Sequence, residues 1–233
     1  MSARWGPPVP RARQGRAVRR LVLLGVPEPT PRLEQPIVRR VLRRLERQPW
    51  QHGRALWDRD AGGRDYTVDC VHVEYGLAPD PIWAGLDMGP VWVRSRRYLL
   101  QGVPVMWAVS YYPAHIVDGT QITRPDSGPG GVYARLSELG YPPLRFVENI
   151  QTRMPTRREA RVLGLPRNVP VMSTVRTTWA ADGTPIEIAV QILAGDCFLL
   201  RVTIDAEPAP VASVALASAP SLGHSGLIPS PHR

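Results

Sequence analysis

The 233-residue sequence contains no lysine, only two cysteines and no long apolar run. Because no run of about 18 apolar residues occurs, no transmembrane helix is expected. The apolar core of residues 19–26 is too short for a signal peptide and no clear cleavage site follows it, so we expect a cytoplasmic protein. Two cysteines do not indicate a small secreted domain that is cross-linked by disulfides. A disulfide between Cys70 and Cys197 is one interpretation, but two buried, unpaired thiols are the favoured one.

The common catalytic and metal-binding motifs are also absent. The sequence has no P-loop, no G-x-G-x-x-G between a strand and a helix, no H-E-x-x-H and no G-x-S-x-G. The five histidines show no ligand spacing, and His72 fits a packed or edge position in a strand better than a general base. No pair of cysteines can form a zinc site. We therefore expect no metal, no cofactor and no enzymatic activity.

Positive charge is carried by arginine alone and is unevenly distributed. Residues 1–54 hold 13 arginines and 3 glutamates, whereas residues 55–233 hold 16 arginines and 17 acidic residues. The net charge of +9 therefore lies entirely at the N-terminus. A basic arm can bind nucleic acid through counterion release. A solvated, partly disordered arm explains the same pattern equally well, and biased genome composition is an alternative source of the arginines.

The stretch from Pro90 to Pro113 has the pattern of a β-hairpin. Apolar and polar residues alternate over 91–96, which is the period of a strand. Gln101-Gly102 is a turn signal, because glycine accepts the positive φ of a tight hairpin. A second run rich in aromatic and β-branched residues follows at 105–112. This hairpin is the unit around which the remaining predictions are arranged.

A similar unit recurs between Pro170 and Val190. Both copies begin with Pro-Val, continue with an arginine-bearing strand and turn through Gly-x-Pro. A short apolar segment precedes each copy, at 82–86 and at 160–165. Chance similarity in a β-rich chain is the alternative, but the shared Pro-Val start and Gly-x-Pro turn favour an internal duplication.

The rest of the chain predicts an α+β domain with an antiparallel sheet of about five to seven strands and short flanking helices. Residues 1–35 are rich in proline and arginine and are expected to be mostly unstructured. The expected elements are a basic amphipathic helix at 36–48, a strand at 65–75, a helical turn at 79–86, a helix at 132–140, a strand at 144–153, a helix capped by Thr156 and Glu159, and a strand at 197–204. Residues 206–233 are Ala/Pro/Ser-rich and are expected to form a disordered tail.

A few polar residues on this mostly apolar sheet are candidates for ligand binding. Antiparallel pairing brings the strand of Arg96 beside that of Ser110. A guanidinium there can bind a carboxylate or phosphate, with the hydroxyl as a further donor. Glu187 in the second hairpin could accept from ligand hydroxyls or amines. The loop 128–131 precedes a helix, whose N-terminal N–H groups favour an anion. Arg96 as a surface ion-pair partner and the loop as a plain turn are the alternatives.

Residues from about 44 to 203 resemble the UTRA domain, the effector-binding half of HutC-subfamily GntR transcription regulators. The matching segments are Val91 to Val105, Ser110-Tyr-Tyr-Pro113, Gly131-Val-Tyr-Ala-Arg-Leu136, Arg153-Met-Pro, Leu163-Gly-Leu-Pro, Arg176 through Asp182-Gly-Thr-Pro-Ile-Glu187, and Gly195-Asp196. The order and spacing of these segments carry the resemblance, because none is diagnostic alone. It implies a chorismate-lyase-like fold, a homodimer, and a small-molecule effector, possibly anionic, that controls an attached winged helix-turn-helix.

By position, the resemblance implies five ligand-binding residues: Arg96, Tyr98, Ser110, Tyr133 and Glu187. The first arginine of the family's Arg-x-Arg pattern is placed on Arg96, and the second falls on Tyr98. The Tyr-Arg that commonly precedes Gly-Asp is replaced by Leu193-Ala194. These departures argue against a sugar phosphate as the effector.

The N-terminal residues 1–43 are too short and too proline-rich for the family's DNA-binding domain, and they contain no recognition-helix pattern. The predicted organisation is an arm at 1–43, a ligand-sensing domain at 44–205 and a tail at 206–233. DNA binding is then expected only if a winged helix-turn-helix is supplied or through the basic arm. No membrane partner is expected. The alternatives are a lyase-like enzyme on the same fold and nonspecific nucleic-acid binding by the arm.

Overall fold

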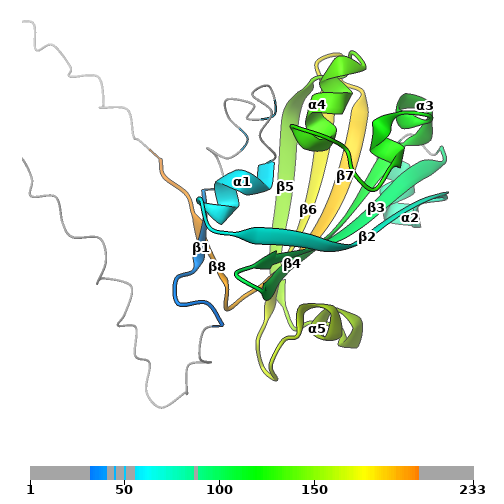
Figure 1. Cartoon of the computed structure of the whole chain (residues 1–233). Coiled ribbons are helices and arrows are strands. Elements are labelled where there is room, and N and C mark those ends of the chain that lie inside the picture. Colours follow the sequence, from blue (N-terminus) through cyan, green and yellow to red (C-terminus); the bar gives the residue numbers. More distant parts are fainter. Residues whose placement is uncertain (1–31, 41–44, 46–49, 51–55, 87–88, 205–233) are drawn as a thin grey trace, which may run out of the picture. The chain divides into compact units, whose positions relative to one another are not determined.

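The computed structural model describes residues 32–40, 45, 50, 56–86 and 89–204. Residues up to Val202 belong to one compact unit, which is the subject of this section. Its elements are β1 (Ile37–Arg40), α1 (Leu56–Ala61), β2 (Tyr66–Gly76), α2 (Asp80–Gly85), β3 (Val91–Leu100), β4 (Val103–Pro113), α3 (Ala114–Val117), η2 (Gln121–Thr123), α4 (Gly131–Glu138), β5 (Pro143–Arg153), α5 (Arg157–Leu163), β6 (Val171–Ala180), β7 (Pro185–Ala194) and β8 (Phe198–Arg201) (Figure 1).

The main sheet has six antiparallel strands in the order β2-β3-β4-β7-β6-β5. The predicted α+β class is therefore confirmed, and so is the predicted hairpin β3–β4. At its turn, Gln101 and Gly102 have φ values of 51° and 77°, the two positive angles that a two-residue type I′ turn requires. The second predicted hairpin is β6–β7, and its second strand pairs with β4 at the centre of the sheet.

The order of elements repeats within the sheet. A strand, a short helix and a hairpin occur first as β2-α2-β3-β4 and again as β5-α5-β6-β7. The two hairpins meet through β4 and β7, so each half runs from the middle of the sheet to one edge (Figure 1). This arrangement supports the internal duplication inferred from the sequence.

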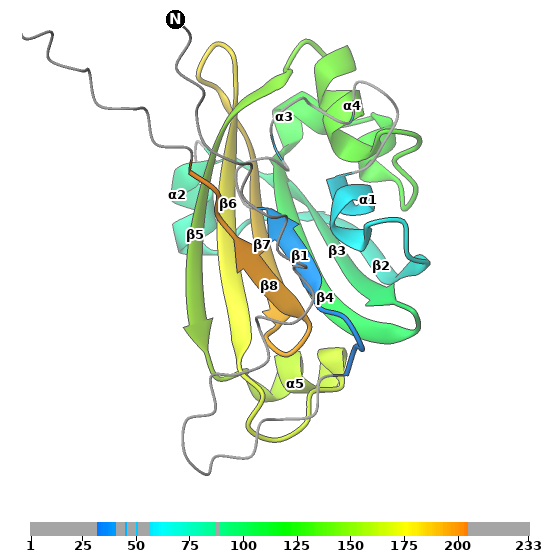
Figure 2. The ribbon, with the colours of Figure 1, turned by 90° about the vertical axis from the view of Figure 1, so that its left-hand side faces the viewer.

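The two faces of the sheet are covered differently. On one face, α2 packs near Ile188 and α5 packs near Ile192. The alternate residues of β7, including Glu187 and Gln191, face the other side, where α1, α4 and the strands β1 and β8 lie. Figure 2 shows β1 and β8 side by side against this second face. The period of two in a strand thus separates an apolar packing face from a face that carries polar groups.

The predicted helix at 36–48 is wrong at its start. Residues 37–40 form β1, which pairs in parallel with β8, and the residues of 41–48 other than residue 45 lie outside the described residues. Ile37 and Arg39 are buried while their neighbours are not, which is the burial period of a strand. Ordered structure also begins before residue 44, because Leu33 is buried and the Arg32 Nε donates to Asp196 Oδ2 at 2.8 Å. The remainder of the predicted arm and the predicted tail lie outside the described residues.

The two cysteines are free, and only one of them is buried. Cys197 packs in the core as predicted. Cys70 is exposed, contrary to the prediction, because it lies in a β-bulge of β2 where the register with β3 slips between Asp69 and His72. Its φ of 49° is rare for a residue with a Cβ and marks the extra residue of the bulge.

The predicted capping box at the start of α5 is confirmed and supports a test of pH dependence. The Thr156 hydroxyl accepts from the Glu159 N–H, and the Glu159 carboxylate accepts from the Thr156 N–H and from both Arg153 terminal nitrogens. The hydrogen bonds from Arg153, helped by the cap, lower the pKa of Glu159 to about 2. A carboxylate with a lowered folded-state pKa stabilises the fold above about pH 4.5 and loses this effect as the pH falls toward 2.

We therefore expect the wild type to lose about 1–2 kcal/mol more stability than Glu159→Gln between pH 6 and pH 3, from the shift in this one group. Urea denaturation at the two pH values measures the difference. Equal losses in the two proteins would show that Glu159 does not contribute to acid sensitivity.

Candidate effector pocket

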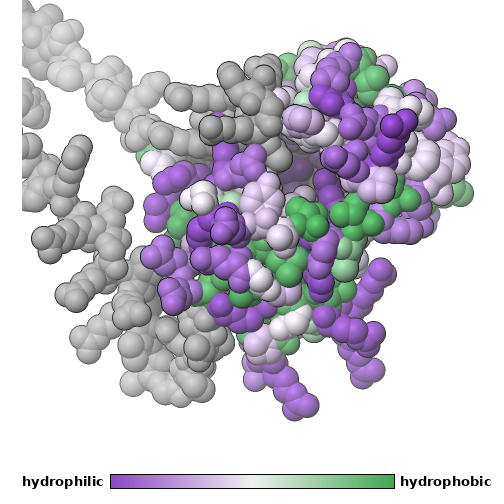
Figure 3. All heavy atoms as spheres, viewed as in Figure 1, coloured by the Kyte–Doolittle hydropathy of each residue, from purple (hydrophilic) through white to green (hydrophobic). Residues whose placement is uncertain are grey.

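A cavity of about 480 Å³ lies between the polar face of the sheet, helix α1 and the loop that precedes α4. Figure 3 shows the hollow between α4 and β2, on a face where hydrophilic and hydrophobic residues are intermixed. The volume is in the range that small-molecule pockets usually have. The cavity is therefore large enough for a ligand of metabolite size.

The polar groups of the cavity floor come from alternate residues of the strands, which face the same side of the sheet. Residues of β3 and β4 that are two apart share a face, so Arg94, Arg96 and Tyr98 line the cavity from β3, and Met106, Ala108, Ser110 and Tyr112 line it from β4. Pairing across four strands sets Arg94 beside Ser110, Ala189 and Arg176 in one row. The next rows contain Gln191 on one side and Glu187 on the other. Residues distant in sequence thus converge because they occupy neighbouring rows of one sheet.

Arg94 forms hydrogen bonds that hold the loop around residues 122–125, which closes one side of the cavity. Its guanidinium is 1% exposed and donates to the carbonyl oxygens of Ile122 at 2.6 Å, of Arg124, and of Pro125 at 2.9 Å. Its Nε–H is buried without an acceptor. Burial and the nearby Arg96 charge lower the pKa of Arg94 from its ordinary value. Because the acceptors of Arg94 are carbonyl oxygens and not carboxylates, Arg94 adds positive charge at this end of the cavity.

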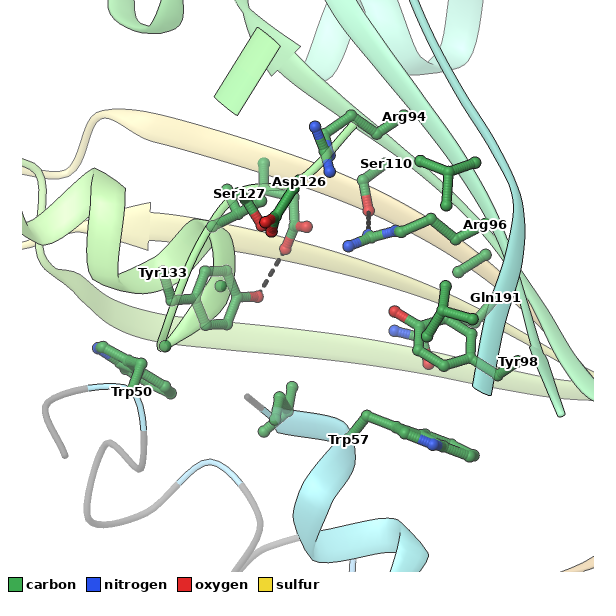
Figure 4. A pocket seen from close by; sticks show the side chains of 18 of the residues that line it. Trp50, Trp57, Arg94, Arg96, Tyr98, Ser110, Asp126, Ser127, Tyr133 and Gln191 are labelled. Carbon is green, nitrogen blue, oxygen red and sulfur yellow. Dashed lines mark hydrogen bonds between the residues drawn. The ribbon is translucent and has the colours of Figure 1, made fainter. Parts of the chain in front are cut away.

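Arg96 points into the cavity beside Arg94 (Figure 4). Its Nη2 donates to Ser110 Oγ at 3.1 Å, and its Nε–H is buried with no acceptor. A guanidinium has five N–H donors, so most of its hydrogen-bonding capacity is directed at the cavity. Among the described residues, no carboxylate oxygen lies within 4.0 Å of the guanidinium nitrogens of Arg94 or Arg96. Two adjacent guanidinium groups of this kind favour an anion.

Glu187 is the centre of a buried network. Its two oxygens accept from Tyr112 at 2.7 Å, from Tyr133 at 2.5 Å and from Thr178 at 3.4 Å, and they pair with Arg176 at 3.2 Å. Burial opposes ionisation, but the Arg176 charge and the two tyrosine hydroxyls outweigh it, and the pKa of Glu187 falls below its ordinary value. These contacts favour the ionised form of Glu187; its Oε2 accepts from three protein donors and its Oε1 from Tyr112 alone.

The loop 125–131 and the start of α4 form one rim of the cavity. Gly130 takes a φ of 77° at the N-cap, and no side chain caps the helix. Gly128 is also left-handed, and a Cβ there would approach the Gln121 side chain to 3.0 Å. The glycines thus allow a tight turn whose backbone faces the cavity. Asp126 is exposed on this rim, and its Oδ1 accepts from the Gly128 N–H at 2.8 Å.

Aromatic rings make the remaining walls. Trp57 of α1 lies 4.9 Å from the Tyr98 ring and 6.2 Å from the Tyr66 ring, measured between centroids. Trp50 lies 4.9 Å from the Tyr133 ring in an edge-to-face contact. All five rings line the cavity, so it has a positively charged end and an aromatic side.

The structure brings all five predicted contact residues to this cavity: Arg96, Tyr98, Ser110, Tyr133 and Glu187. Two of them are also committed to contacts within the protein, because Tyr133 donates to Glu187 Oε2, which accepts from Arg176 and Thr178 as well. Sequence reasoning missed Arg94, although its two-residue spacing from Arg96 places both on one face and completes an Arg-x-Arg pattern with Arg94 first. It also missed Gln191, for which only strand alternation from Glu187 gave a signal.

A family model described as the UTRA domain matches residues 61–198, which is more than half of the chain. The chain belongs to the UTRA domain family. The resemblance and the fold predicted from the sequence are thereby confirmed, and the chain has the effector-binding domain of GntR-family transcription regulators.

The proteins similar to this UTRA chain include a transcriptional regulator and a repressor. An uncharacterized HTH-type transcriptional regulator from Streptomyces coelicolor is 32% identical over 181 residues, covering 72% of this chain and 66% of the relative. PhnF from Mycobacterium smegmatis is 25% identical with a TM-score of 0.56, covering 63% of this chain and 66% of PhnF. The chain therefore spans slightly less than two thirds of these two relatives. The C-terminal domain of the histidine utilization repressor from Pseudomonas syringae shares the fold, with 18% identity, a TM-score of 0.55, and coverage of 61% and 100%.

Two features are absent from the described part of the UTRA chain. No helix there is long and apolar enough to cross a membrane. No group of three or more His, Cys, Asp or Glu side chains among those residues could hold a metal ion.

Proposed function

We propose that this UTRA chain is the ligand-sensing part of a cytoplasmic transcription regulator and that its cavity binds a small anion. The observation that carries the proposal is Arg96, whose guanidinium faces the cavity with no carboxylate oxygen within 4.0 Å among the described residues, although the Glu187 charge acts on it from farther away. Arg94 adds a second positive charge, whereas Arg176 is paired with the carboxylates of Glu187 and Glu148. The charged end of the cavity is therefore suited to a phosphate or carboxylate group.

A buried chain of contacts links the cavity to the N-terminal strand. Gln191 lines the cavity, and its Oε1 accepts from Arg39 Nη1 of β1 at 3.0 Å. Arg39 also pairs with Asp60 of α1 at 2.8 Å, and α1 carries Trp57 into the cavity wall. A ligand that contacts Gln191 or Trp57 would bias the position of β1. Two-state coupling of this kind is how effector binding would alter the DNA affinity of a winged helix-turn-helix attached to the regulator.

The proposed regulator is a homodimer. Support comes from the family resemblance and from β5, an edge strand of 11 residues that exposes Leu144, Val147 and Ile150. Long edge strands with exposed apolar residues are ready to pair with another chain. Residues 1–31, which carry much of the basic arm, lie outside the described residues, so nucleic-acid binding by the arm stays a prediction from charge.

A lyase-like reaction in the same cavity has less support. A general acid or base must be able to reach a proton on the substrate. The buried carboxylate of the cavity, Glu187, is held by four protein donors and an ionised state is favoured for it. Burial also raises the pKa of Tyr112 and Tyr133, which makes both tyrosines poor bases near neutral pH. We therefore propose a sensor and not an enzyme.

Titration with inorganic phosphate tests the proposal. We expect phosphate to raise the melting temperature of the wild type, and Arg96→Ala to weaken phosphate binding at least about tenfold because a charge-assisted hydrogen-bond donor is lost. Arg97→Ala is the matched control, since Arg97 is the next residue of β3, lies on the opposite face and pairs with Asp69. Calorimetry on the three proteins gives the affinities. Unchanged affinity in Arg96→Ala, or no binding by the wild type, would contradict the proposal.

A further inference from the structure

The cavity supports a narrower statement about its ligand, which rests on the proposed function. We infer that the effector is an anion whose acid group is joined to a planar, apolar ring, so that the class is an aryl or heteroaryl acid and not a polyhydroxylated sugar phosphate. The inference comes from what the cavity offers beyond its charged end: few open acceptors, one oriented amide and a side made of aromatic rings.

Hydroxyl groups of a ligand need acceptors, and the cavity has few to give. Glu187 Oε2 accepts from Tyr133, Thr178 and Arg176, so a sugar hydroxyl can reach only the remaining lone pair of Oε1, beside Tyr112, without displacing a protein donor. The carboxylate of Asp126 is exposed on the rim and already accepts from the Gly128 N–H. A buried ligand hydroxyl left without an acceptor costs the free energy of its lost hydration. The cavity thus selects against ligands with many hydroxyl groups.

Gln191 further restricts the ligand. Its Oε1 is taken by Arg39, so its amide NH₂ is the end that remains for the cavity. Figure 4 draws Gln191 in the part of the cavity where Tyr98 and Trp57 also lie. A group at this position meets a hydrogen-bond donor, which suits a ring nitrogen, an ether or a carbonyl oxygen and not a second donor.

The aromatic side of the cavity begins at the next residue on the same face of β3 as Arg96. Arg96 and Tyr98 are two residues apart on the same face of β3, which is about 7 Å along a strand. Trp57 stacks at a tilt against Tyr98, with 4.9 Å between ring centroids, and Met106 and Val68 add apolar surface. A single ring attached directly to the acid group reaches from Arg96 to this aromatic side, where ring–ring contacts favour it.

Three phosphate compounds with different substituents separate the possibilities. Phenyl phosphate, glucose 6-phosphate and inorganic phosphate present the same charged head, so differences in calorimetric affinity for the full-length chain report the substituent. We expect phenyl phosphate to bind at least tenfold more tightly than inorganic phosphate, and glucose 6-phosphate to bind no more tightly than inorganic phosphate. Tyr98→Leu is expected to reduce the ratio of the phenyl phosphate affinity to the inorganic phosphate affinity at least threefold.

The outcomes distinguish this inference from the proposal beneath it. If glucose 6-phosphate binds as tightly as phenyl phosphate, the ligand class is wrong and anion sensing stands. If phenyl phosphate binds more tightly but Tyr98→Leu has no effect, the ring does not occupy the aromatic side and the inference is overturned. If none of the three compounds binds, anion sensing itself fails and takes the inference with it. The comparison among compounds uses the wild type alone, so it does not depend on the folding of the variant.

Discussion

Replacing Glu187 by glutamine is expected to lower the free energy of unfolding by about 3 kcal/mol or more, because it removes one partner of a buried ion pair. Glu187 is 2% exposed, and the substitution leaves the Arg176 guanidinium with Glu148 at 3.5 Å as its ionic partner. It also places an amide NH₂ against hydroxyls that now donate to the carboxylate. Urea denaturation followed by circular dichroism measures the loss.

Glu138→Gln is the matched control for this experiment. Glu138 is also a glutamate paired with an arginine, Arg135, but its side chain is 61% exposed. Exposed pairs contribute about 0–1 kcal/mol, so this variant is expected to stay close to the wild type. If the two substitutions have equal effects, the network around Glu187 is not a major source of stability.

Replacing Arg94 by methionine is expected to lower the free energy of unfolding by about 2–4 kcal/mol, because three carbonyl groups lose a charged donor. The carbonyls belong to Ile122, Arg124 and Pro125, so the loop beside α4 should loosen and phosphate binding should weaken as well. Denaturation measures the first effect, and calorimetry with inorganic phosphate measures the second.

Arg124→Met controls for the loss of one positive charge in the same loop, since the Arg124 residue is exposed. It is expected to change stability by less than about 0.5 kcal/mol, as surface substitutions usually do. Arg94→Met with stability like that of Arg124→Met would show that the three carbonyl contacts do not hold the loop.

Local signals in the sequence were sufficient for the parts of the fold that depend on local physics. The hairpin β3–β4 follows from alternation and from a turn at Gln101 and Gly102. The cap of α5 follows from Thr156 and Glu159, which are three residues apart. In both cases the residues that determine the structure are neighbours in the chain, so no distant partner can override them.

Predictions were wrong where a distant partner decides the outcome. The apolar spacing from Ile37 onward fits a helix, but these residues pair with β8, about 160 residues later, and their burial follows the strand. Alternation correctly put Arg96, Ser110 and Glu187 on one face. It could not reveal that Glu187 is enclosed by side chains from three other elements or that Arg94 is committed to the 122–125 carbonyls, because both facts depend on packing.

The repeated unit has a consequence for how specificity can change. Arg96 is the sixth residue of β3 and Arg176 is the sixth residue of β6, so the two arginines hold equivalent places in the two halves. Arg176 is enclosed by Glu148 and Glu187 and anchors one half, whereas Arg96 keeps its guanidinium for the cavity in the other half. Of the two equivalent arginines, Arg176 therefore stabilises the sheet and Arg96 is available to bind a ligand. Substitutions around Arg96 can therefore alter which anion is recognised while the ionic anchor of the sheet stays intact.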